Sequence, residues 1–236
     1  MDTTSIILYS FLGGVLPTII WLGFWLREDK LHPEPKKYIF LTFLFGIFSA
    51  ILVLPLEEYI EYILTIVPTS GILAIILLSF SEELFKFLAA HFSALKKKVT
   101  DEPIDPIIYM ITAALGFAAL ENSLFLMQSM KVIHADINHT ILVGNMRFIG
   151  ATLLHTVSSG ALGFFMGFSF YKKKLFKKEY WLVGLILSVA LHSFFNFFIM
   201  IREGEKIFET FALIWLLIVF LIFSFEIVKK IKKKSY

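Results

Sequence analysis

Seven long apolar stretches follow one another along this chain of 236 residues, and they limit the possible folds more than any other feature. An α-helix needs about 20 residues to cross about 30 Å of hydrocarbon, and each stretch can supply roughly that length. The stretches cover residues 5–26, 38–56, 71–94, 106–129, 148–170, 180–201 and 207–228. The sequence therefore predicts an all-α fold, a polytopic transmembrane helix bundle with about seven spans.

The segments between the stretches are too short to fold separately, so we expect residues 1–236 to form a single integral membrane domain. Pro55 and the pair Glu57-Glu58 shorten the second stretch. We therefore expect that helix to end near residue 56 and Glu57, Glu58 and Glu61 to lie in an acidic loop. The chain has no cysteine, which excludes disulfides, thiolate zinc sites and a cysteine nucleophile.

Basic residues alternate between the two sides of the predicted membrane. Lysine runs follow the third stretch (96–98), the fifth stretch (172–178) and the last stretch (229–234), and the loop after the first stretch is also basic. Because basic loops stay in the cytoplasm, the N-terminus is predicted outside and the C-terminus in the cytoplasm. A composition rich in Lys, Ile and Phe suggests a low-GC bacterium, so we expect a multi-pass protein of the bacterial cytoplasmic membrane.

Charged residues interrupt the third stretch, where Glu82, Glu83 and Lys86 lie within five positions. One charge at a bilayer centre costs about 2.5–3.5 kcal/mol on insertion scales, so such residues usually serve a function. Lys86 is placed to pair with either glutamate across one helical turn, which leaves the other carboxylate without a local partner. An ion pair that only locks the bundle would not require the second glutamate.

Polar residues of four stretches fall at one depth. Counted at about 1.5 Å per residue from the predicted outer surface, they lie roughly 8–17 Å deep. Small and polar residues also recur at helical spacing on these stretches, which favours close packing of the four helices around the charged layer. The layer comprises Glu82, Glu83, Glu121, His155, His192 and Asn196.

Four motifs in order resemble those of the PrsW family of bacterial intramembrane proteases, which is related to the CAAX-protease and bacteriocin-processing group. They are Glu82-Glu83-x-x-Lys86, Phe117-Ala118-Ala119-Leu120-Glu121-Asn122, His155-x-x-x-Ser159 and His192-x-x-x-Asn196, and they cover about residues 71–201. A lysine at the third motif position after the paired glutamates, rather than an arginine, is closer to PrsW than to the CAAX enzymes. The resemblance implies the first, extracytoplasmic cut in a membrane-anchored anti-sigma factor during a stress response.

The predicted chemistry is peptide hydrolysis by an activated water. Either Glu82 or Glu83 would be the general base, and spacing alone does not decide between them. Lys86 would keep the other glutamate ionised, and His155 would position the water or protonate the leaving amine. His192 and Asn196 would donate to the oxyanion. Supporting positions are Lys86, Glu121, Asn122 and Ser159.

Two alternatives use the same residues. Glu82, Glu121, His155 and His192 are an acceptable zinc set, so the hydrolysis is either metal-free or zinc-dependent. A proton-coupled transporter or channel would also need buried Glu, His and Lys at one level, although no inverted repeat is evident. A non-catalytic scaffold would not need all six polar groups. The expected partners are the lipid bilayer and a single-span membrane protein substrate, and no nucleic-acid signature occurs.

Overall fold

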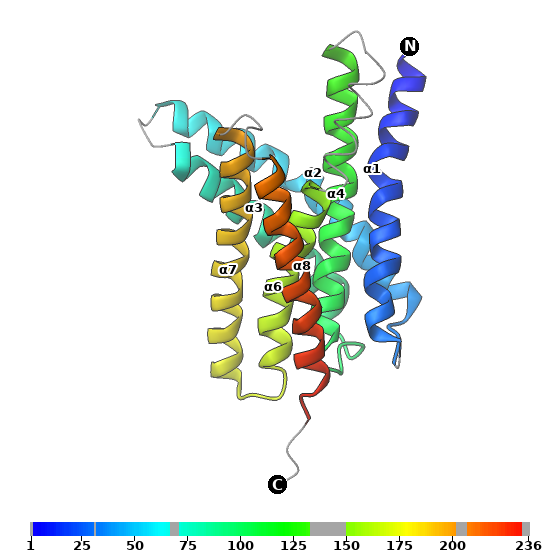
Figure 1. Cartoon of the computed structure of the whole chain (residues 1–236), viewed down its shortest axis with the longest axis vertical. Helices are drawn as coiled ribbons and strands as arrows, with labels where there is room; N and C mark the ends of the chain where they lie inside the picture. The colour runs from blue at the N-terminus through cyan, green and yellow to red at the C-terminus, as the bar shows by residue number, and fades with distance from the viewer. Residues whose placement is uncertain (1, 31, 67–70, 133–149, 202–206, 233–236) are drawn as a thin grey trace.

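The computed structural model describes residues 2–30, 32–66, 71–132, 150–201 and 207–232. Within these ranges the chain is a bundle of helices without a strand, which confirms the predicted fold class. The first helix begins and the last helix ends at opposite ends of the bundle (Figure 1). The helical elements are α1 (Thr3–Trp25), η1 (Leu26–Asp29), α2 (Lys36–Ile66), α3 (Gly71–Ala90), the π-helical turn η2 (His91–Leu95), α4 (Asp105–Val132), α6 (Ala151–Phe168), α7 (Lys174–Ile201) and α8 (Ile207–Lys229).

Each predicted apolar stretch corresponds to one long helix. Six helices in the described ranges are long and apolar enough to cross a membrane, namely α1, α2, α4, α6, α7 and α8. The seventh, α3, has 20 residues, which span about 30 Å, but it carries the charges of Glu82, Glu83 and Lys86. The protein is therefore an integral membrane protein, and the orientation of its termini stays a prediction.

The expected end of the second helix near residue 56 is wrong. Helix α2 continues through Pro55 to Ile66, so Glu57, Glu58 and Glu61 lie on its last turns and not in a loop. A proline removes one backbone hydrogen bond, but membrane helices tolerate it where neighbouring groups compensate. Figure 1 shows α2 crossing the bundle obliquely, which carries its second half away from α1.

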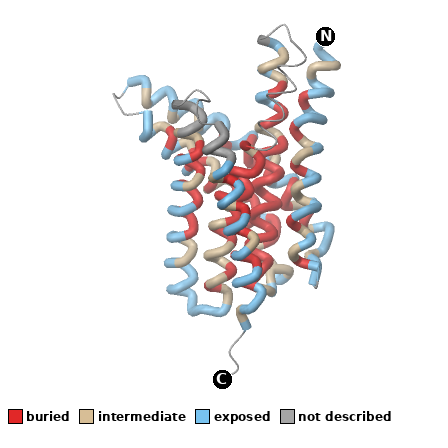
Figure 2. Tube along the Cα trace, viewed as in Figure 1, coloured by how far each residue is buried: buried red, intermediate tan, exposed pale blue. Residues whose placement is uncertain are grey.

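Helix α4 forms the centre of the bundle. It packs against α1, α2, α3 and α6, and every side chain from Asp105 to Ala119 is buried. Figure 2 shows the buried residues concentrated along α4 and the helices around it, whereas the outer helices expose one face. A membrane helix buried on all sides needs small residues for close packing, and α4 supplies Ala113, Ala114, Gly116, Ala118 and Ala119.

A close helix crossing joins α2 to α4 at two glycines. A Cβ on Gly46 would lie 2.2 Å from the carbonyl oxygen of Ala113, and a Cβ on Gly116 would lie 2.1 Å from that of Phe43. Only glycine lets the two backbones approach so closely. This crossing fixes the second half of α2 next to the residues of α4 that precede Glu121.

Helix α3 has two different faces. Ser79, Glu83, Lys86 and Ala90 follow one another at helical spacing and are completely buried. On the other side Ile72, Ile76 and Phe80 are exposed. In a membrane the apolar face can meet lipid, so the charged face is forced toward α6 and α7, which α3 contacts directly.

Candidate active site

Glu83 is the centre of the buried polar cluster. Its side chain is fully buried, and both of its carboxylate oxygens are occupied. Oε1 pairs with Lys86 Nζ at 2.9 Å, with Ser158 Oγ at 3.0 Å and with His192 Nδ1 at 2.8 Å. Oε2 accepts hydrogen bonds from Ser159 Oγ at 2.7 Å and Ser188 Oγ at 2.8 Å. Glu83 therefore has no free position at which it could take a proton from water.

Lys86 supplies the positive charge of the cluster. Its buried ammonium lies 2.9 Å from Glu83 Oε1, 3.2 Å from Glu82 Oε2 and 2.7 Å from His155 Nδ1. It also lies 4.4 Å from the centre of the Phe117 ring. A buried lysine is stable only where it is paired, and this one pairs with both glutamates of the motif. Spacing had suggested that one of the two carboxylates would be left without Lys86.

The carboxylates of Glu83 and Glu121 set the orientation of the two histidines. Glu83 holds His192 through Nδ1, and Glu121 Oε2 lies 2.6 Å from His155 Nε2. A carboxylate on one imidazole nitrogen favours a proton there and leaves the lone pair on the other nitrogen. The two rings lie edge to face with centroids 5.1 Å apart.

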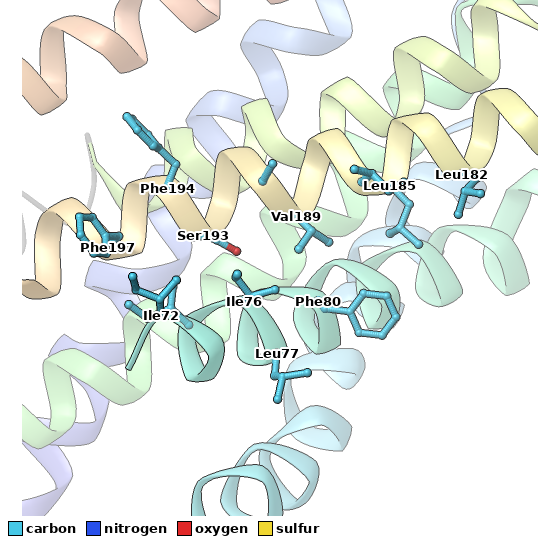
Figure 3. Close-up of a pocket in the computed structure, with 13 residues that line it drawn as sticks. Ile72, Ile76, Leu77, Phe80, Leu182, Leu185, Val189, Ser193, Phe194 and Phe197 are labelled. Carbon is cyan, nitrogen blue, oxygen red and sulfur yellow. The ribbon is translucent and has the colours of Figure 1, made fainter. Parts of the chain in front are cut away.

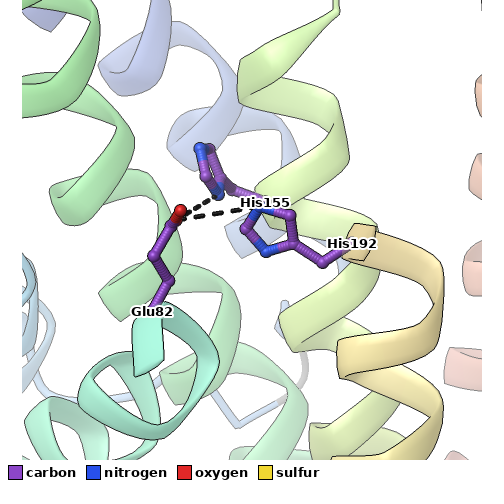
Figure 4. Close-up of side chains that lie close together, drawn as sticks. All are labelled: Glu82, His155 and His192. Atoms are coloured by element: carbon purple, nitrogen blue, oxygen red, sulfur yellow. Dashed lines mark ion pairs between the residues drawn. The ribbon is translucent and has the colours of Figure 1, made fainter. Parts of the chain in front are cut away.

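The remaining imidazole nitrogens face Glu82. Oε2 of Glu82 lies 3.7 Å from His192 Nε2 and 3.9 Å from His155 Nδ1 (Figure 4). One ligand atom from each of these three residues lies within 4.8 Å of the others. Two imidazoles and a carboxylate, each imidazole backed by a further carboxylate, form a donor set that suits zinc and leaves a position for water. The side chains present therefore fit a metal ion.

Glu121 differs from its predicted place among the metal ligands. Its Oε2 bonds the nitrogen of His155 that points away from Glu82, and it is not one of the three clustered donors. Its side chain is 37% exposed, whereas that of Glu82 is 13% exposed. Glu121 is positioned to orient His155, which is compatible with its prediction as a supporting residue.

Of the three other predicted residues, one belongs to the cluster and two lie outside its hydrogen bonds. Ser159 belongs to it through Glu83. Asn122 Nδ2 donates to Thr152 Oγ1 at 3.0 Å, which links α4 to α6 one turn before His155. Asn196 is half-buried on α7, one turn beyond His192, and within the described part of the chain it makes no hydrogen bond.

Sequence reasoning did not assign Ser158, Ser188 or Glu57 to the site. Ser158 and Ser188 both donate to Glu83, and a signal for Ser188 was its position four residues before His192. Glu57 of α2 lines a cavity of about 60 Å³ together with Glu82 and Glu121. No spacing rule could find Glu57, because its place depends on α2 continuing past Pro55.

An apolar groove of about 720 Å³ runs between α3 and α7, the two helices that carry Glu82 and His192 (Figure 3). Its walls include Ile72, Ile76 and Phe80 of α3 and Val189 and Phe194 of α7. Next to His192, Ser193 also lines the groove, and its buried hydroxyl has no hydrogen-bond partner in the described structure. The groove thus places an apolar surface beside the polar cluster.

Comparison with known proteins agrees with this geometry. The profile described as PrsW family intramembrane metalloprotease matches residues 34–224. Protease PrsW of Geobacillus kaustophilus (strain HTA426) is 29% identical over 198 residues, which cover 81% of this chain and 80% of the relative. Protease PrsW of Clostridioides difficile (strain 630) is 27% identical over 196 residues, with 81% and 79% covered. Protease PrsW of Bacillus subtilis (strain 168) is 24% identical over 188 residues, with 78% and 80% covered.

No solved structure matches the chain. The family match includes all four motifs that carried the resemblance in the sequence, and it covers most of the chain. The predicted family and the predicted class of enzyme are both confirmed. This chain is an intramembrane protease and belongs to the PrsW family of intramembrane metalloproteases.

Proposed function

We propose that this protein is an endopeptidase of the bacterial cytoplasmic membrane that cuts a single-span membrane protein near its extracytoplasmic end. A membrane-anchored anti-sigma factor is the substrate class that we favour, so the cut would begin a stress response. The observation that carries the proposal is the convergence of Glu82, His155 and His192 on one point in the helix bundle. Family membership favours this reading over a proton-coupled transporter.

We assign Glu82, His155 and His192 as the residues that hold a zinc ion. A zinc ion bound there would lower the pKa of a water molecule and polarise the scissile carbonyl. Glu83 and Glu121 hold the two imidazoles in orientation through their other nitrogens. In the structure Lys86 donates a hydrogen bond to His155 Nδ1 at 2.7 Å. This hydrogen bond would have to break before His155 Nδ1 could bind a metal. Lys86 would then keep Glu82 and Glu83 as its partners.

The two adjacent glutamates have different tasks in this proposal. Glu83 is a positioning residue, because five polar groups surround it and none of its lone pairs points to an open site. Glu82 is the residue that faces the reacting groups, because its Oε2 lies near both imidazoles and it lines the adjacent cavity. In a metal-free version of the reaction, the same placement would make Glu82 the general base.

The groove between α3 and α7 supports a membrane-anchored substrate. It is almost wholly apolar and lies between the two helices that carry the site, so an apolar transmembrane segment could lie beside the catalytic residues without leaving the bilayer. The unpaired hydroxyl of Ser193 can donate a hydrogen bond to a peptide carbonyl. The hydrocarbon chain of a lipid has no such acceptor, so this hydroxyl favours a peptide in the groove. We therefore propose this groove as the docking surface for the transmembrane segment of the substrate.

Cleavage and metal content measured on one purified sample test this proposal. The native protein in detergent should cleave a single-span substrate with an extracytoplasmic stub, should carry about one equivalent of zinc and should lose activity with a chelator. Glu82→Gln should lose both zinc and cleavage, because a neutral amide is a poor zinc ligand. Glu61→Gln, which changes an exposed glutamate of α2, should keep both.

Two results would contradict parts of this assignment. Full cleavage by Glu82→Gln would remove Glu82 from the mechanism. Cleavage by native protein that contains no zinc and ignores the chelator would leave a glutamate–water protease and would overturn the metal assignment.

A further inference from the structure

A small cavity lies on the side of Glu82 that faces α2. It has a volume of about 60 Å³, and Ala50, Val53, Leu54 and Glu57 of α2, Glu82 of α3, and Phe117, Glu121 and Leu124 of α4 line it. One water molecule occupies about 30 Å³ in the liquid, and a polar wall is needed to keep it ordered. Three carboxylates and sufficient volume make this a place where water can bind next to Glu82.

Glu57 reaches this cavity because of its helical register. Ala50 and Val53 precede it by seven and four positions, and both are buried against Phe117. Glu57 itself is half-buried, whereas Glu58 is exposed. The same face of α2 that packs on α4 therefore presents Glu57 to the cavity.

The cavity belongs to the same site as the histidines. Its wall residue Phe117 packs against the ring of His155 with centroids 5.6 Å apart, and Lys86 Nζ lies over the Phe117 ring. Its wall residue Glu121 bonds His155 directly. A group in the cavity therefore lies next to Glu82 and one side chain away from His155.

Glu57 differs from the three glutamates of the cluster in its partners. Glu83 is fully occupied, Glu82 pairs with Lys86, and Glu121 bonds His155. In the part of the chain that the structure describes, Glu57 has neither a hydrogen bond nor an ion pair. A carboxylate that is half-buried, without a partner and beside a cavity of water size is free to receive a proton.

We propose that Glu57 is a catalytic residue, the acceptor of the proton from the attacking water. This inference rests on the proposed function, in which Glu82 is a metal ligand and the base must be another carboxylate. The water proton moves to the Glu57 carboxylate while the water oxygen bonds the carbonyl carbon of the scissile peptide. When the C–N bond breaks, Glu57 returns the proton to the nitrogen of the leaving chain, so that the products are a carboxylic acid and an amine.

Glu57→Gln and Glu58→Gln form a matched pair of variants, since the two residues are adjacent and only the first lines the cavity. The experiment uses the full chain in detergent and measures kcat, KM and zinc content on the single-span substrate. General acid–base catalysis typically contributes about 10²–10⁴-fold. Glu57→Gln should therefore lower kcat about 100-fold or more with KM and zinc content unchanged, and Glu58→Gln should match the native protein.

A second variant keeps the test decisive if Glu57→Gln does not fold. Glu57→Ala should be inactive, and added formate should restore part of its turnover by acting as the missing carboxylate, which a structural role would not allow. Absence of any rescue, or a kcat of Glu57→Gln within about threefold of native, would overturn the role. Loss of zinc together with turnover would also overturn it, because Glu57 would then support the metal site.

The proposed function and the role of Glu57 fail in different ways. If native protein cleaves the substrate and Glu57→Gln cleaves it equally well, only the role of Glu57 falls. If native protein cleaves no single-span substrate, the proposed function falls, and the role of Glu57 falls with it.

Discussion

Two buried polar clusters in the described part of this protein accommodate their carboxylates in different ways. The active-site cluster, which we propose as the catalytic centre, is formed by Glu82, Glu83, Lys86, His155 and His192 on α3, α6 and α7. The acidic cluster is formed by Asp29, Glu34, Asp105 and Tyr109, near the end of α1 and the beginning of α4. The first contains an ammonium group and two imidazoles, whereas no ion pair to a described lysine or arginine reaches the second.

The acidic cluster relies on hydrogen bonds instead of cations. Tyr109 donates its hydroxyl to Glu34, and the backbone N–H of Glu34 donates to Asp29 Oδ2 at 3.2 Å. Asp105 Oδ2 accepts from the backbone N–H groups of Asp101 and Glu102, both at 2.8 Å, so it ties down the preceding loop. Without a cation, such a cluster remains favourable only if a carboxyl keeps its proton.

The comparison shows two ways in which a helix bundle can accommodate buried carboxyl groups. In the active-site cluster Lys86 pairs with both glutamates, so Glu82 can stay negative as the proposed ligand and Glu83 as the group that holds His192. In the acidic cluster the carboxyls accept hydrogen bonds from a tyrosine and from the loop backbone, and they hold the loops in place. Paired cations therefore distinguish the catalytic cluster from the structural one, and variants that remove a charge should affect the two clusters differently.

The largest effect is expected from Glu83→Gln. Removing one partner of a buried ion pair typically costs about 3–5 kcal/mol, because the other charge is left without compensation. Glu83 is the fully buried partner of Lys86, so Glu83→Gln should lower the melting temperature and also abolish cleavage through misplacement of His192. Thermal unfolding in detergent measures the first effect, and the substrate assay measures the second.

A second substitution separates charge from packing. In Glu83→Gln the Lys86 ammonium keeps Glu82 but loses its fully buried partner. In Glu83→Gln/Lys86→Met this ammonium is gone, so the double variant should be more stable than Glu83→Gln alone while it remains inactive. Equal melting temperatures of the two variants would mean that the charge of Lys86 does not destabilise Glu83→Gln. The pairing of cations would then not distinguish the two clusters.

The sequence predicted the active-site cluster better than the acidic cluster for a physical reason. Depth along a membrane helix follows from counting residues, so Glu82, Glu121, His155 and His192 could be brought to one layer without a structure. Distances in the acidic cluster depend on how the helix ends and loops pack, which no periodicity encodes. Asp105 illustrates this difference, because its carboxylate accepts hydrogen bonds from the loop before α4, a contact that helical spacing does not predict.

Within the active site, the sequence could not separate Glu82 from Glu83. The two are adjacent, so both meet any rule based on spacing, and only the packing of α6 and α7 around α3 shows which one is enclosed. Glu57 was missed because the predicted helix ended at Pro55, and the Gly46–Gly116 crossing that fixes α2 on α4 is a tertiary contact. Charge pattern and length thus predict the layer, and packing assigns the roles.

An intermediate effect is expected from pH, and it belongs to the acidic cluster. Burial, together with the neighbouring Asp105 and Asp29, raises the pKa of Glu34 to about 8 against the opposing effect of the Tyr109 hydrogen bond. In an unfolded chain the pKa of a glutamate is about 4.3. The folded state therefore binds this proton more tightly, and its stabilising contribution is complete below about pH 4 and is lost as the pH rises through 8.

Melting temperatures between pH 5 and pH 9 test this sign. The native protein should become less stable as the pH rises, and Glu34→Gln should show a flatter slope, because an amide can accept the Tyr109 hydrogen bond without titrating. Glu61→Gln, at an exposed position, should keep the native slope. Identical slopes for native protein and Glu34→Gln would show that Glu34 does not carry the proton of the acidic cluster.

The smallest effect is expected from Asn196→Ala, and it tests where the active-site cluster ends on α7. The sequence placed Asn196 with His192 as a donor to the oxyanion, and the structure places it one turn farther along α7, half-buried and outside the hydrogen bonds of the cluster. If a bound substrate brings the oxyanion within its reach, Asn196→Ala should lower kcat with little change in KM, because an oxyanion donor acts mainly in the transition state. A preorganised oxyanion donor contributes about 10²–10³-fold to kcat. The loss of Asn196 should cost less, since none of the described residues forms a hydrogen bond that holds its amide in place. A kcat equal to that of the native protein would show that the active site on α7 does not extend beyond His192. A rise in KM alone would show that Asn196 contacts the bound substrate and not the transition state.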